Sequence, residues 1–194
     1  MKYKKKPLAD LLRADRTVFT FQDICLLWGS DSQRAMISAV NHYVRTGDLI
    51  RLRRGIYARD HDYDRLELAS RIYTPAYVSF ETVLKEEGLI FQYYETIFAA
   101  SYLSRLLEID SQAYQFHKLK QSVLVDPVGI NHKQGRAVAT LERAFLDTLY
   151  INRDYHFDNL NPVNWERVFE ILPIYQNKQM EKRVNRLYNE YRSN

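Results

Sequence analysis

The stretch from Thr20 to Ala58 constrains the fold of this chain more than any other part of the sequence. It opens with Thr20, a residue type that commonly caps a helix, and apolar residues follow at helical spacing: Ile24, Leu27 and Trp28. Gly29 can adopt the left-handed conformation in which many helices end. We therefore expect a short amphipathic helix between Thr20 and Gly29.

A second, longer helix is expected after a brief turn. Asp31 or Ser32 can cap it, and Gly47 follows Thr46 at its expected end. The residues spaced to pack on the preceding helices are Met36, Ala39, Val40, Tyr43 and Val44. The opposite side carries Gln33, Arg34, Ser38, Asn41, His42 and Arg45. The pattern predicts an amphipathic helix with one continuous polar and basic face.

This polar face has two interpretations. A solvated helix surface is the usual meaning of such a stripe. The other interpretation is a DNA recognition helix, because amide and guanidinium groups can form paired hydrogen bonds with base edges in the major groove. Taken alone, the helix favours the solvated surface.

A short hairpin after this helix shifts the balance toward DNA. Residues 49–53 end in an alternation of apolar and basic side chains, and Arg54-Gly55 makes a tight connection to residues 56–58. Leu52 and Ile56 are expected to face inward, which leaves three basic side chains available to phosphates: Arg51, Arg53 and Arg54. Two helices followed by a basic hairpin are typical of a DNA-binding winged helix-turn-helix.

The sequence therefore predicts roles for individual side chains. Base reading is expected from the polar face of the second helix, through Gln33, Arg34, Ser38, Asn41 and His42. Phosphate binding is expected from the helix end, the hairpin and the basic N-terminal arm, through Lys4, Lys5, Lys6, Arg45, Arg51, Arg53 and Arg54. For the arm, a contribution to solubility alone is an equally good interpretation.

Charge is distributed unevenly along the 194 residues. Residues 1–60 contain twelve Lys and Arg against six Asp, a net charge of +6, whereas the remainder has a net charge of −2. Such asymmetry is expected when only the N-terminal part binds a polyanion such as double-stranded DNA. The sequence contains neither an apolar run of membrane-spanning length nor a signal peptide, so we expect a soluble, cytoplasmic protein without a membrane partner. The single cysteine, Cys25, rules out a disulfide framework and is expected to be a small core residue.

The rest of the chain predicts a second domain over residues 61–194, joined to residues 1–60 by a polar hinge. Helices are expected around residues 66–72, from a cap at Ser79 to Gly88, from a cap at Thr140 to residue 150, from Asn161-Pro162 and over residues 180–191. Strands are expected at residues 76–78, 96–101, 113–117, 122–125 and 136–139. The expected fold class is α+β, with an N-terminal winged helix-turn-helix followed by a mixed α/β domain that has a small sheet and C-terminal helices.

Motifs of catalysis and metal binding are missing from the sequence. The five histidines are far apart, and the common phosphate-binding and nucleophile motifs are not present. The acid pairs Glu86 with Glu87 and Glu108 with Asp110 are the candidates for general acid and base, but solvated charges beside turns are the simpler interpretation. We therefore expect a protein that is not an enzyme and that needs no metal and no cofactor.

Three blocks of sequence carry a resemblance to a known family. They are residues 53–58 (RRGIYA), residues 76–84 (AYVSFETVL) with 88–90 (GLI), and residues 139–147 (ATLERAFLD). In content and order they resemble the AbiEi family of antitoxins from type IV toxin-antitoxin systems. The likeness covers roughly residues 10–150, and its specificity comes from the combination of the blocks.

This resemblance implies a bacterial antitoxin and transcriptional repressor that is not an enzyme. Its winged helix would bind inverted repeats in its own promoter, and its C-terminal domain would counteract a cognate nucleotidyltransferase-like toxin. The chain is short for the family because its C-terminal portion is compressed. The alternative is a solitary winged-helix regulator whose C-terminal domain binds another protein.

Overall fold

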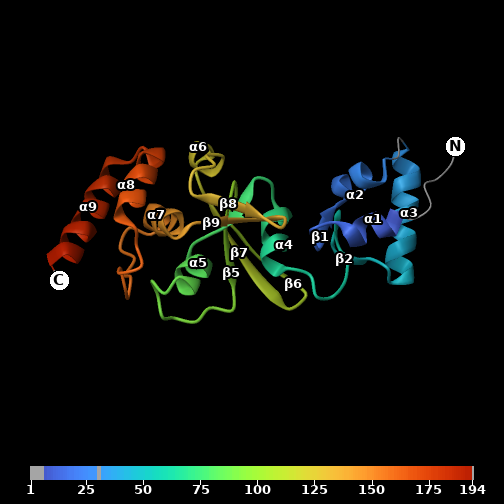
Figure 1. Ribbon diagram of the computed structural model, residues 1–194, viewed down its shortest axis with the longest axis horizontal. Helices are drawn as coiled ribbons and strands as arrows, with labels where there is room; N and C mark the ends of the chain where they lie inside the picture. Colours follow the sequence, from blue (N-terminus) through green and yellow to red (C-terminus); the bar gives the residue numbers. More distant parts are fainter. Residues whose placement is uncertain (1–6, 30–31, 194) are drawn as a thin grey trace.

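The computed structural model describes residues 7–29 and 32–193 as a mixed α+β protein with two sheets (Figure 1). The N-terminal elements lie at one end of the molecule, the larger sheet lies in the middle, and the last helices lie at the other end (Figure 1). The predicted α+β class is therefore confirmed. Among the helices of the described residues, none combines the length and the apolar character that a bilayer crossing requires.

The N-terminal part consists of three helices and a small sheet. Its elements are α1 (Pro7–Arg13), β1 (Val18–Thr20), α2 (Phe21–Trp28), α3 (Gln33–Thr46), β2 (Ile50–Arg53) and β3 (Ile56–Ala58). The three strands are antiparallel and lie in the order β1-β3-β2. The two helices and the hairpin expected between Thr20 and Ala58 are thus present as secondary structure.

Local sequence accounts for the ends of α2 and α3. Thr20 and Asp23 form a capping box, in which the Asp23 backbone N donates to Thr20 Oγ1 at 3.1 Å and the Thr20 backbone N donates to Asp23 Oδ2 at 2.8 Å. Ser32 Oγ accepts a hydrogen bond from the backbone N of Ala35 at the start of α3. Gly47 ends α3 with a φ of 82°, which glycine adopts without strain. Asp31, the other cap considered for α3, lies outside the described residues.

The C-terminal part surrounds a six-stranded sheet with the order β6-β7-β5-β4-β9-β8. Its elements are α4 (Arg65–Ile72), β4 (Ala76–Val78), α5 (Glu81–Glu86), β5 (Ile97–Ser101), β6 (Arg105–Ile109), β7 (Gln112–Lys118), α6 (Gln121–Leu124), β8 (Ile130–Lys133), β9 (Arg136–Ala139), α7 (Leu141–Ile151), α8 (Trp165–Ile171), the 3-10 helix η1 (Leu172–Tyr175) and α9 (Lys178–Ser193).

Helices cover both faces of this sheet. Tyr73, at the end of α4, packs on Phe116, and their ring centroids are 4.8 Å apart. Phe80, at the start of α5, packs on His117 with a centroid distance of 5.0 Å. Phe116 and His117 are successive residues of β7 and therefore point to opposite faces. Helix α4 thus lies on one face, and α5 lies on the other together with α7, on which it packs.

One predicted strand is wrong, and two strands were not predicted. Residues 122–125 fall in the short helix α6 and the turn after it, and Val123 and Leu124 are buried side by side. A short apolar run does not reveal by periodicity whether it is a strand or a helical turn. The unpredicted strands, β6 and β8, are the two edges of the sheet, where mostly exposed side chains give a weak apolar pattern.

Two predicted helix starts also differ from the structure. Ser79 does not cap α5, because its hydroxyl donates to Asp147 Oδ2 at 2.8 Å, and Phe80 precedes the helix with a φ of 56°. Helix α8 is capped by Asn164 and not opened by Asn161-Pro162.

The small sheet contributes to both hydrophobic cores of the chain. Phe19 and Tyr57 pack in an N-terminal core, against which the half-buried Cys25 also packs. Val18 directly precedes Phe19 in β1, and Ile56 directly precedes Tyr57 in β3. Both pack in the larger core of the C-terminal part. Because successive side chains of a strand point to opposite faces, the β1-β3 pair is covered on both sides. The two parts of the chain are therefore packed together through this sheet.

A pH-dependent stability is expected from His117, which lies half-buried between the rings of Phe80 and Phe98. Burial lowers the pKa of His117 from its ordinary value of 6.5. Below that pH the unfolded chain binds a proton that the folded chain does not, so the free energy of unfolding should fall as the pH drops through 6.5. His117→Phe should reduce this slope, by at most about 1.4 kcal/mol per pH unit. Urea unfolding at neutral and mildly acidic pH measures how the free energy of unfolding changes with pH. The control is His132→Phe, which replaces an exposed histidine. If His117→Phe leaves the slope unchanged, His117 does not cause the pH dependence.

Candidate nucleic-acid interface

Helix α3 presents its polar face away from the N-terminal core. Met36 and Val40 are buried in that core and fix the rotation of the helix about its axis. The predicted base-reading residues and Arg45 are all exposed: Gln33, Arg34, Ser38, Asn41, His42 and Arg45. A shallow hollow of about 590 Å³ runs along α3 and is lined by Ala35, Ser38, Ala39, Asn41, His42, Tyr43 and Arg45. The structure thus brings the predicted helix residues together on one surface.

Ile37 belongs to the same surface, although it was not predicted. It is 46% exposed and lies on α3 between Arg34 and Asn41. Its exposure was predictable from helical spacing, because residues next to each other in a helix point in different directions and Ile37 directly follows the buried Met36. The exposed surface of α3 therefore contains an apolar group among its polar and basic ones.

Arg51 connects the hairpin to α3. Its Nη2 donates a hydrogen bond to Asn41 Oδ1 at 2.6 Å, and its guanidinium carbon lies 5.8 Å from the ring centroid of Tyr57. Since Tyr57 is buried in the N-terminal core, Arg51 is placed between a fixed ring and the exposed face of the helix. Arg45 lies close to His42 on the same helix, with Nη2 and Nδ1 3.5 Å apart.

Arg53 does not lie where simple strand alternation predicts it. A β-bulge between Arg51 and Arg53 shifts the register, so that Arg53 pairs with Ile56 and faces the C-terminal part. Its guanidinium carbon lies 5.5 Å from the ring centroid of Tyr73, and its Nη1 is buried without a hydrogen-bond partner among the described residues. Arg53 is therefore half-buried in the contact between the two parts, where its guanidinium is less accessible to phosphates than the sequence predicted.

The remaining predicted phosphate contacts differ in how far the structure describes them. Arg54 is exposed in the tight turn between β2 and β3, where Gly55 has a φ of 78°. Arg51 is also exposed. The arm residues Lys4, Lys5 and Lys6 lie outside the described residues.

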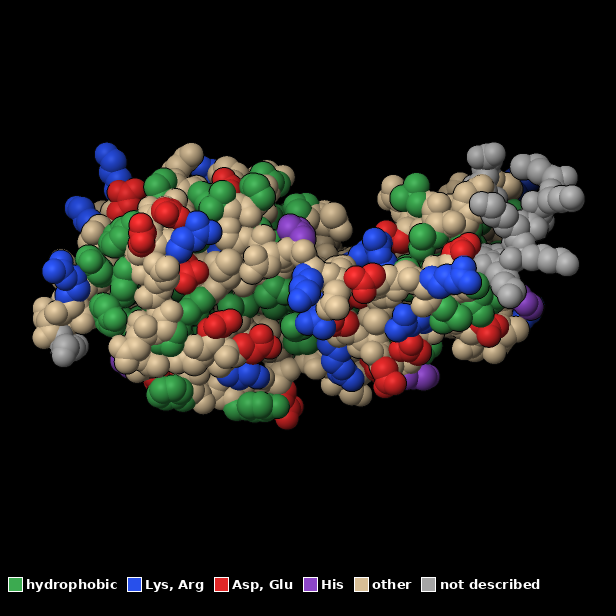
Figure 2. All heavy atoms as spheres, in the orientation of Figure 1, with side chains coloured by type: hydrophobic (Ala, Val, Ile, Leu, Met, Phe, Trp, Pro, Cys, Tyr) green, Lys and Arg blue, Asp and Glu red, His purple; other side chains and the backbone are tan. Residues whose placement is uncertain are grey.

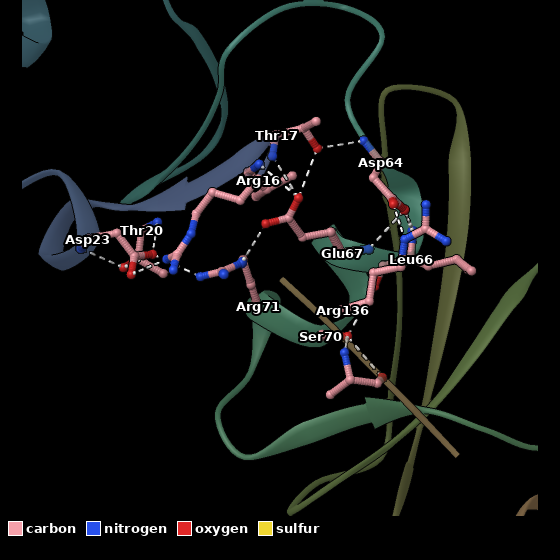
Figure 3. A network of polar contacts seen from close by, with 12 residues as sticks. Arg16, Thr17, Thr20, Asp23, Asp64, Leu66, Glu67, Ser70, Arg71 and Arg136 are labelled. Carbon is pink, nitrogen blue, oxygen red and sulfur yellow. Dashed lines mark hydrogen bonds and ion pairs between the residues drawn. The ribbon is translucent and has the colours of Figure 1, made fainter. Parts of the chain in front are cut away.

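Glu67 of α4 joins the two parts of the chain through a buried carboxylate (Figure 3). Its Oε2 accepts hydrogen bonds from the Thr17 backbone N at 2.8 Å, the Thr17 hydroxyl at 2.9 Å and the Val18 backbone N at 3.2 Å. Such donors offset the high cost of burying a charge. Glu67 was not predicted as a junction residue, although a carboxylate between the apolar positions of a helix indicates such a role.

Arg71 extends this network from α4 to α2 (Figure 3). Its Nε donates to Glu67 Oε1 at 3.1 Å, and its Nη1 donates to Asp23 Oδ2 at 2.9 Å. Asp23 also accepts from Arg16 Nη1 at 3.0 Å and closes the capping box with Thr20. The carboxylate at the start of α2 is thus bonded directly to the first helix of the C-terminal part.

The turn between β8 and β9 packs on the same network. A side chain on Gly135, whose φ is 77°, would overlap Oε1 of Glu67. Arg136, the next residue, forms an ion pair with Asp64, and the backbone N of Asp64 donates to Thr17 Oγ1 at 2.8 Å. The junction between the two parts therefore includes β1, α2, α4 and the β8-β9 hairpin.

A second buried polar cluster lies inside the C-terminal part and centres on Asp147 of α7. Its carboxylate accepts hydrogen bonds from the hydroxyls of Tyr77 at 2.9 Å, Ser79 at 2.8 Å and Tyr175 at 2.7 Å. Arg143, one helical turn earlier, donates from Nε to Asp147 Oδ1 at 3.4 Å. Burial raises the pKa of the Asp147 carboxyl, and the Arg143 guanidinium and the three hydroxyl donors oppose this rise.

This cluster ties α7 to its neighbours. Arg143 donates to the backbone oxygens of Val123 at 2.6 Å and Val128 at 2.7 Å, on either side of the turn after α6. Burial raises the pKa of Tyr77 and Tyr175 well above the ordinary value, so both hydroxyls keep their protons and act as donors. The cluster therefore holds α6, α7, β4 and η1 together.

The candidate acid pairs lie at the surface. Glu86, Glu87, Glu108 and Asp110 are all exposed, and Asp110 accepts a hydrogen bond from the Tyr63 hydroxyl at 3.2 Å. Within residues 7–29 and 32–193, no three His, Cys, Asp or Glu side chains are grouped as metal ligands.

No protein-family model and no curated protein matches the chain. Among solved structures, the chain is similar to the crystal structure of the RV2827C protein from Mycobacterium tuberculosis, with 14% sequence identity and a TM-score of 0.49. The similarity covers 96% of this chain and 76% of that one. The chain is a mixed α+β protein with two sheets.

Proposed function

We propose that the N-terminal part is a winged helix-turn-helix that binds double-stranded DNA, with α3 as the recognition helix and the β2-β3 hairpin as the wing. The observation that carries this proposal is the exposed polar and basic face of α3, opposite the buried Met36 and Val40 and bonded to the hairpin through Arg51. A major groove admits one α-helix, and base edges are read by the side chains that this face carries.

The side chains divide into two groups in this proposal. Base reading is assigned to Gln33, Arg34, Ser38, Asn41 and His42, and Ile37 adds an apolar contact suited to a thymine methyl group. Phosphate contacts are assigned to Arg45, Arg51 and Arg54, with Lys4, Lys5 and Lys6 as further candidates. Arg53 is left out of the second group because it faces Tyr73.

The hydrogen bond between Arg51 and Asn41 gives this interface some rigidity before DNA binds. With Oδ1 held by Arg51, the Asn41 amide group is oriented and its NH₂ group can donate to a base. A side chain that is already ordered loses less conformational entropy on binding. Asn41 is therefore the residue we assign to the most specific base contact.

For the whole chain we propose a transcriptional repressor and antitoxin of a type IV toxin-antitoxin system, which represses its own operon and counteracts a nucleotidyltransferase-like toxin. The support is the resemblance of the three sequence blocks to the AbiEi family. Two of these blocks contribute to one buried cluster, because Tyr77 and Ser79 bond to Asp147. The resemblance therefore concerns the scaffold of the C-terminal part more than its exposed surface.

The alternative is a solitary winged-helix regulator whose C-terminal part binds another protein. The adjacent reading frame distinguishes the two proposals. A nucleotidyltransferase encoded there would support the antitoxin, and a gene of another class would support the solitary regulator. Both proposals share the DNA-binding role of α3 and the wing.

Salt dependence of DNA binding tests the wing directly. Arg51→Ala and Arg54→Ala should each lower the slope of log K against log salt concentration by about 0.9, because each removes one phosphate contact. Fluorescence anisotropy with a duplex from the chain's own upstream region provides the measurement. Arg53→Ala is the matched control, since it removes the same charge from the same hairpin but faces Tyr73.

The outcome of this comparison is decisive for the wing. If Arg53→Ala lowers the slope as much as Arg54→Ala does, the proposed division of the hairpin, in which Arg54 contacts phosphate and Arg53 does not, is refuted. If none of the three variants changes the slope, the wing assignment fails. If the wild-type chain shows no salt-dependent binding to the duplex, the DNA-binding role itself is refuted.

A further inference from the structure

The loop between α5 and β5 exposes two large aromatic side chains. Phe91 and Tyr93 are each 73% exposed. In the same loop, Leu89 and Ile90 are buried in the larger core. The exposure of Phe91 and Tyr93 is therefore not shared by the apolar residues directly before them. Figure 2 shows hydrophobic side chains projecting from the lower edge of the molecule, where Figure 1 places this loop. Exposed aromatic groups of this kind commonly mark a protein-binding surface.

The backbone of this loop is held in place by hydrogen bonds. The Phe91 backbone N donates to Asp158 Oδ2 at 2.8 Å, and the Asp158 backbone N donates to the Leu89 oxygen at 2.9 Å. At the other end, Gln112 Nε2 donates to the Glu95 backbone oxygen at 2.6 Å. Lys85 lies over the ring of Tyr93, with Nζ 4.7 Å from the centroid. The aromatic side chains are therefore presented on an ordered support, which lowers the entropy cost of binding.

The adjoining sheet face extends this surface. Tyr94 packs on Phe98 of β5 with a centroid distance of 5.5 Å. Phe98 pairs with Gln115 of β7, which pairs with the exposed Leu106 of the edge strand β6, so these three residues form a row on one face. We call this surface the aromatic patch and define it by Phe91, Tyr93, Tyr94, Phe98 and Leu106.

The charges in the loop that carries Phe91 and Tyr93 are mainly negative. Residues 85–95 contain one basic residue, Lys85, and three exposed acidic ones: Glu86, Glu87 and Glu95. Glu108 lies on the same sheet face as Leu106, two residues further along β6, and Asp158 contacts the loop at Phe91. Carboxylates repel phosphate groups, so nucleic acid and anionic lipid are poor candidates for this surface.

We propose that the aromatic patch binds a basic protein, through arginine side chains that stack on Phe91 and Tyr93 and pair with the surrounding carboxylates. Arginine suits both contacts, because its planar guanidinium group stacks on aromatic rings and binds carboxylates in a bidentate manner. This surface lies in the C-terminal part and is separate from the proposed DNA-binding face of α3. The aromatic patch is thus where the proposed interaction of the C-terminal part with another protein would take place, and a basic surface is the kind of partner that it fits.

The test uses the full chain and a fluorescein-labelled peptide in which arginine and leucine alternate. We expect saturable binding by anisotropy, weakened about tenfold or more in the double variant Phe91→Ala, Tyr93→Ala. The same peptide with lysine in place of arginine should bind more weakly. An ammonium group does not stack on an aromatic ring as the planar guanidinium does, and it does not bind a carboxylate in a bidentate manner. Glu95→Gln with Glu108→Gln should also weaken binding and reduce its salt dependence.

The matched control is Leu26→Ala, which removes an equally exposed apolar side chain from the N-terminal part. Phe91 and Tyr93 are exposed, so thermal unfolding of the double variant should match the wild type and rule out misfolding. Binding of the DNA duplex by the same variants should be unchanged, which separates this proposal from that of the winged helix.

Several results would overturn the proposal. They are the lack of saturable binding by the arginine peptide, equal binding by the double variant, and equally tight binding of a peptide with glutamate in place of arginine. A wild-type chain that dimerises in analytical ultracentrifugation, with a monomeric Phe91→Ala, Tyr93→Ala variant, would assign the patch to a second copy of this chain and refute the basic partner.

Discussion

Replacing Asp147 with alanine should lower the free energy of unfolding by about 3–5 kcal/mol, the largest effect we expect from a single substitution. Asp147 and Arg143 are both completely buried, so the variant leaves an uncompensated guanidinium in the core. It also leaves three hydroxyls without their acceptor, those of Tyr77, Ser79 and Tyr175. Urea unfolding followed by circular dichroism measures the change.

The control for this prediction is the exposed Asp154→Ala, which should change the free energy of unfolding by less than about 0.5 kcal/mol. A double-mutant cycle gives a sharper test. Arg143→Met and Asp147→Leu together should cost less than the sum of the two single changes, because the double variant buries no unpaired charge. Strictly additive effects would show that the two charges do not compensate each other.

Replacing Glu67 with alanine should lower the free energy of unfolding by about 2–4 kcal/mol and loosen the junction between the two parts. The substitution removes the acceptor of the Thr17 and Val18 backbone N–H groups and one of the two carboxylates bonded to Arg71. Amide hydrogen exchange reports the local effect, since the protons of Thr17 and Val18 should exchange much faster in the variant.

Two further variants separate the local effect from general destabilisation. Gly135→Ala keeps every polar group of the junction but places a methyl group against Glu67, so the same two amides should lose protection. Glu86→Ala removes an exposed carboxylate and should leave them unchanged. If Thr17 and Val18 exchange at the wild-type rate in Glu67→Ala, the carboxylate does not hold the junction.

The sequence was sufficient where structure depends on neighbouring residues. The caps at Thr20, Ser32 and Thr140 and the glycine end of α3 involve groups within a few positions of one another, so they were predicted correctly. The exposed face of α3 follows from helical spacing in the same way. The α+β class and most strands of the larger sheet were predicted for the same reason.

The sequence was insufficient where partners are distant along the chain. Arg53 was misplaced because the register shift that turns it toward Tyr73 belongs to the pairing of β2 with β3, not to either strand alone. Ser79 has the composition of a helix cap, but its hydroxyl bonds to Asp147, 68 positions away. Glu67 bonds to Thr17 across 50 positions, so its identity as the junction residue depends on tertiary contacts that periodicity does not contain.

The sheet that both cores share limits how this protein can evolve or be engineered. A chain cut at residue 60 would leave the side chains of Val18 and Ile56 facing water on one fragment and would uncover their packing partners on the other. We therefore expect that recombination cannot transfer residues 1–60 into another protein without exposing these apolar side chains. In the proposed DNA-binding role, a new sequence preference would have to arise by substitutions on the exposed side of α3, while both buried faces of the small sheet and the contacts of Glu67 stay unchanged.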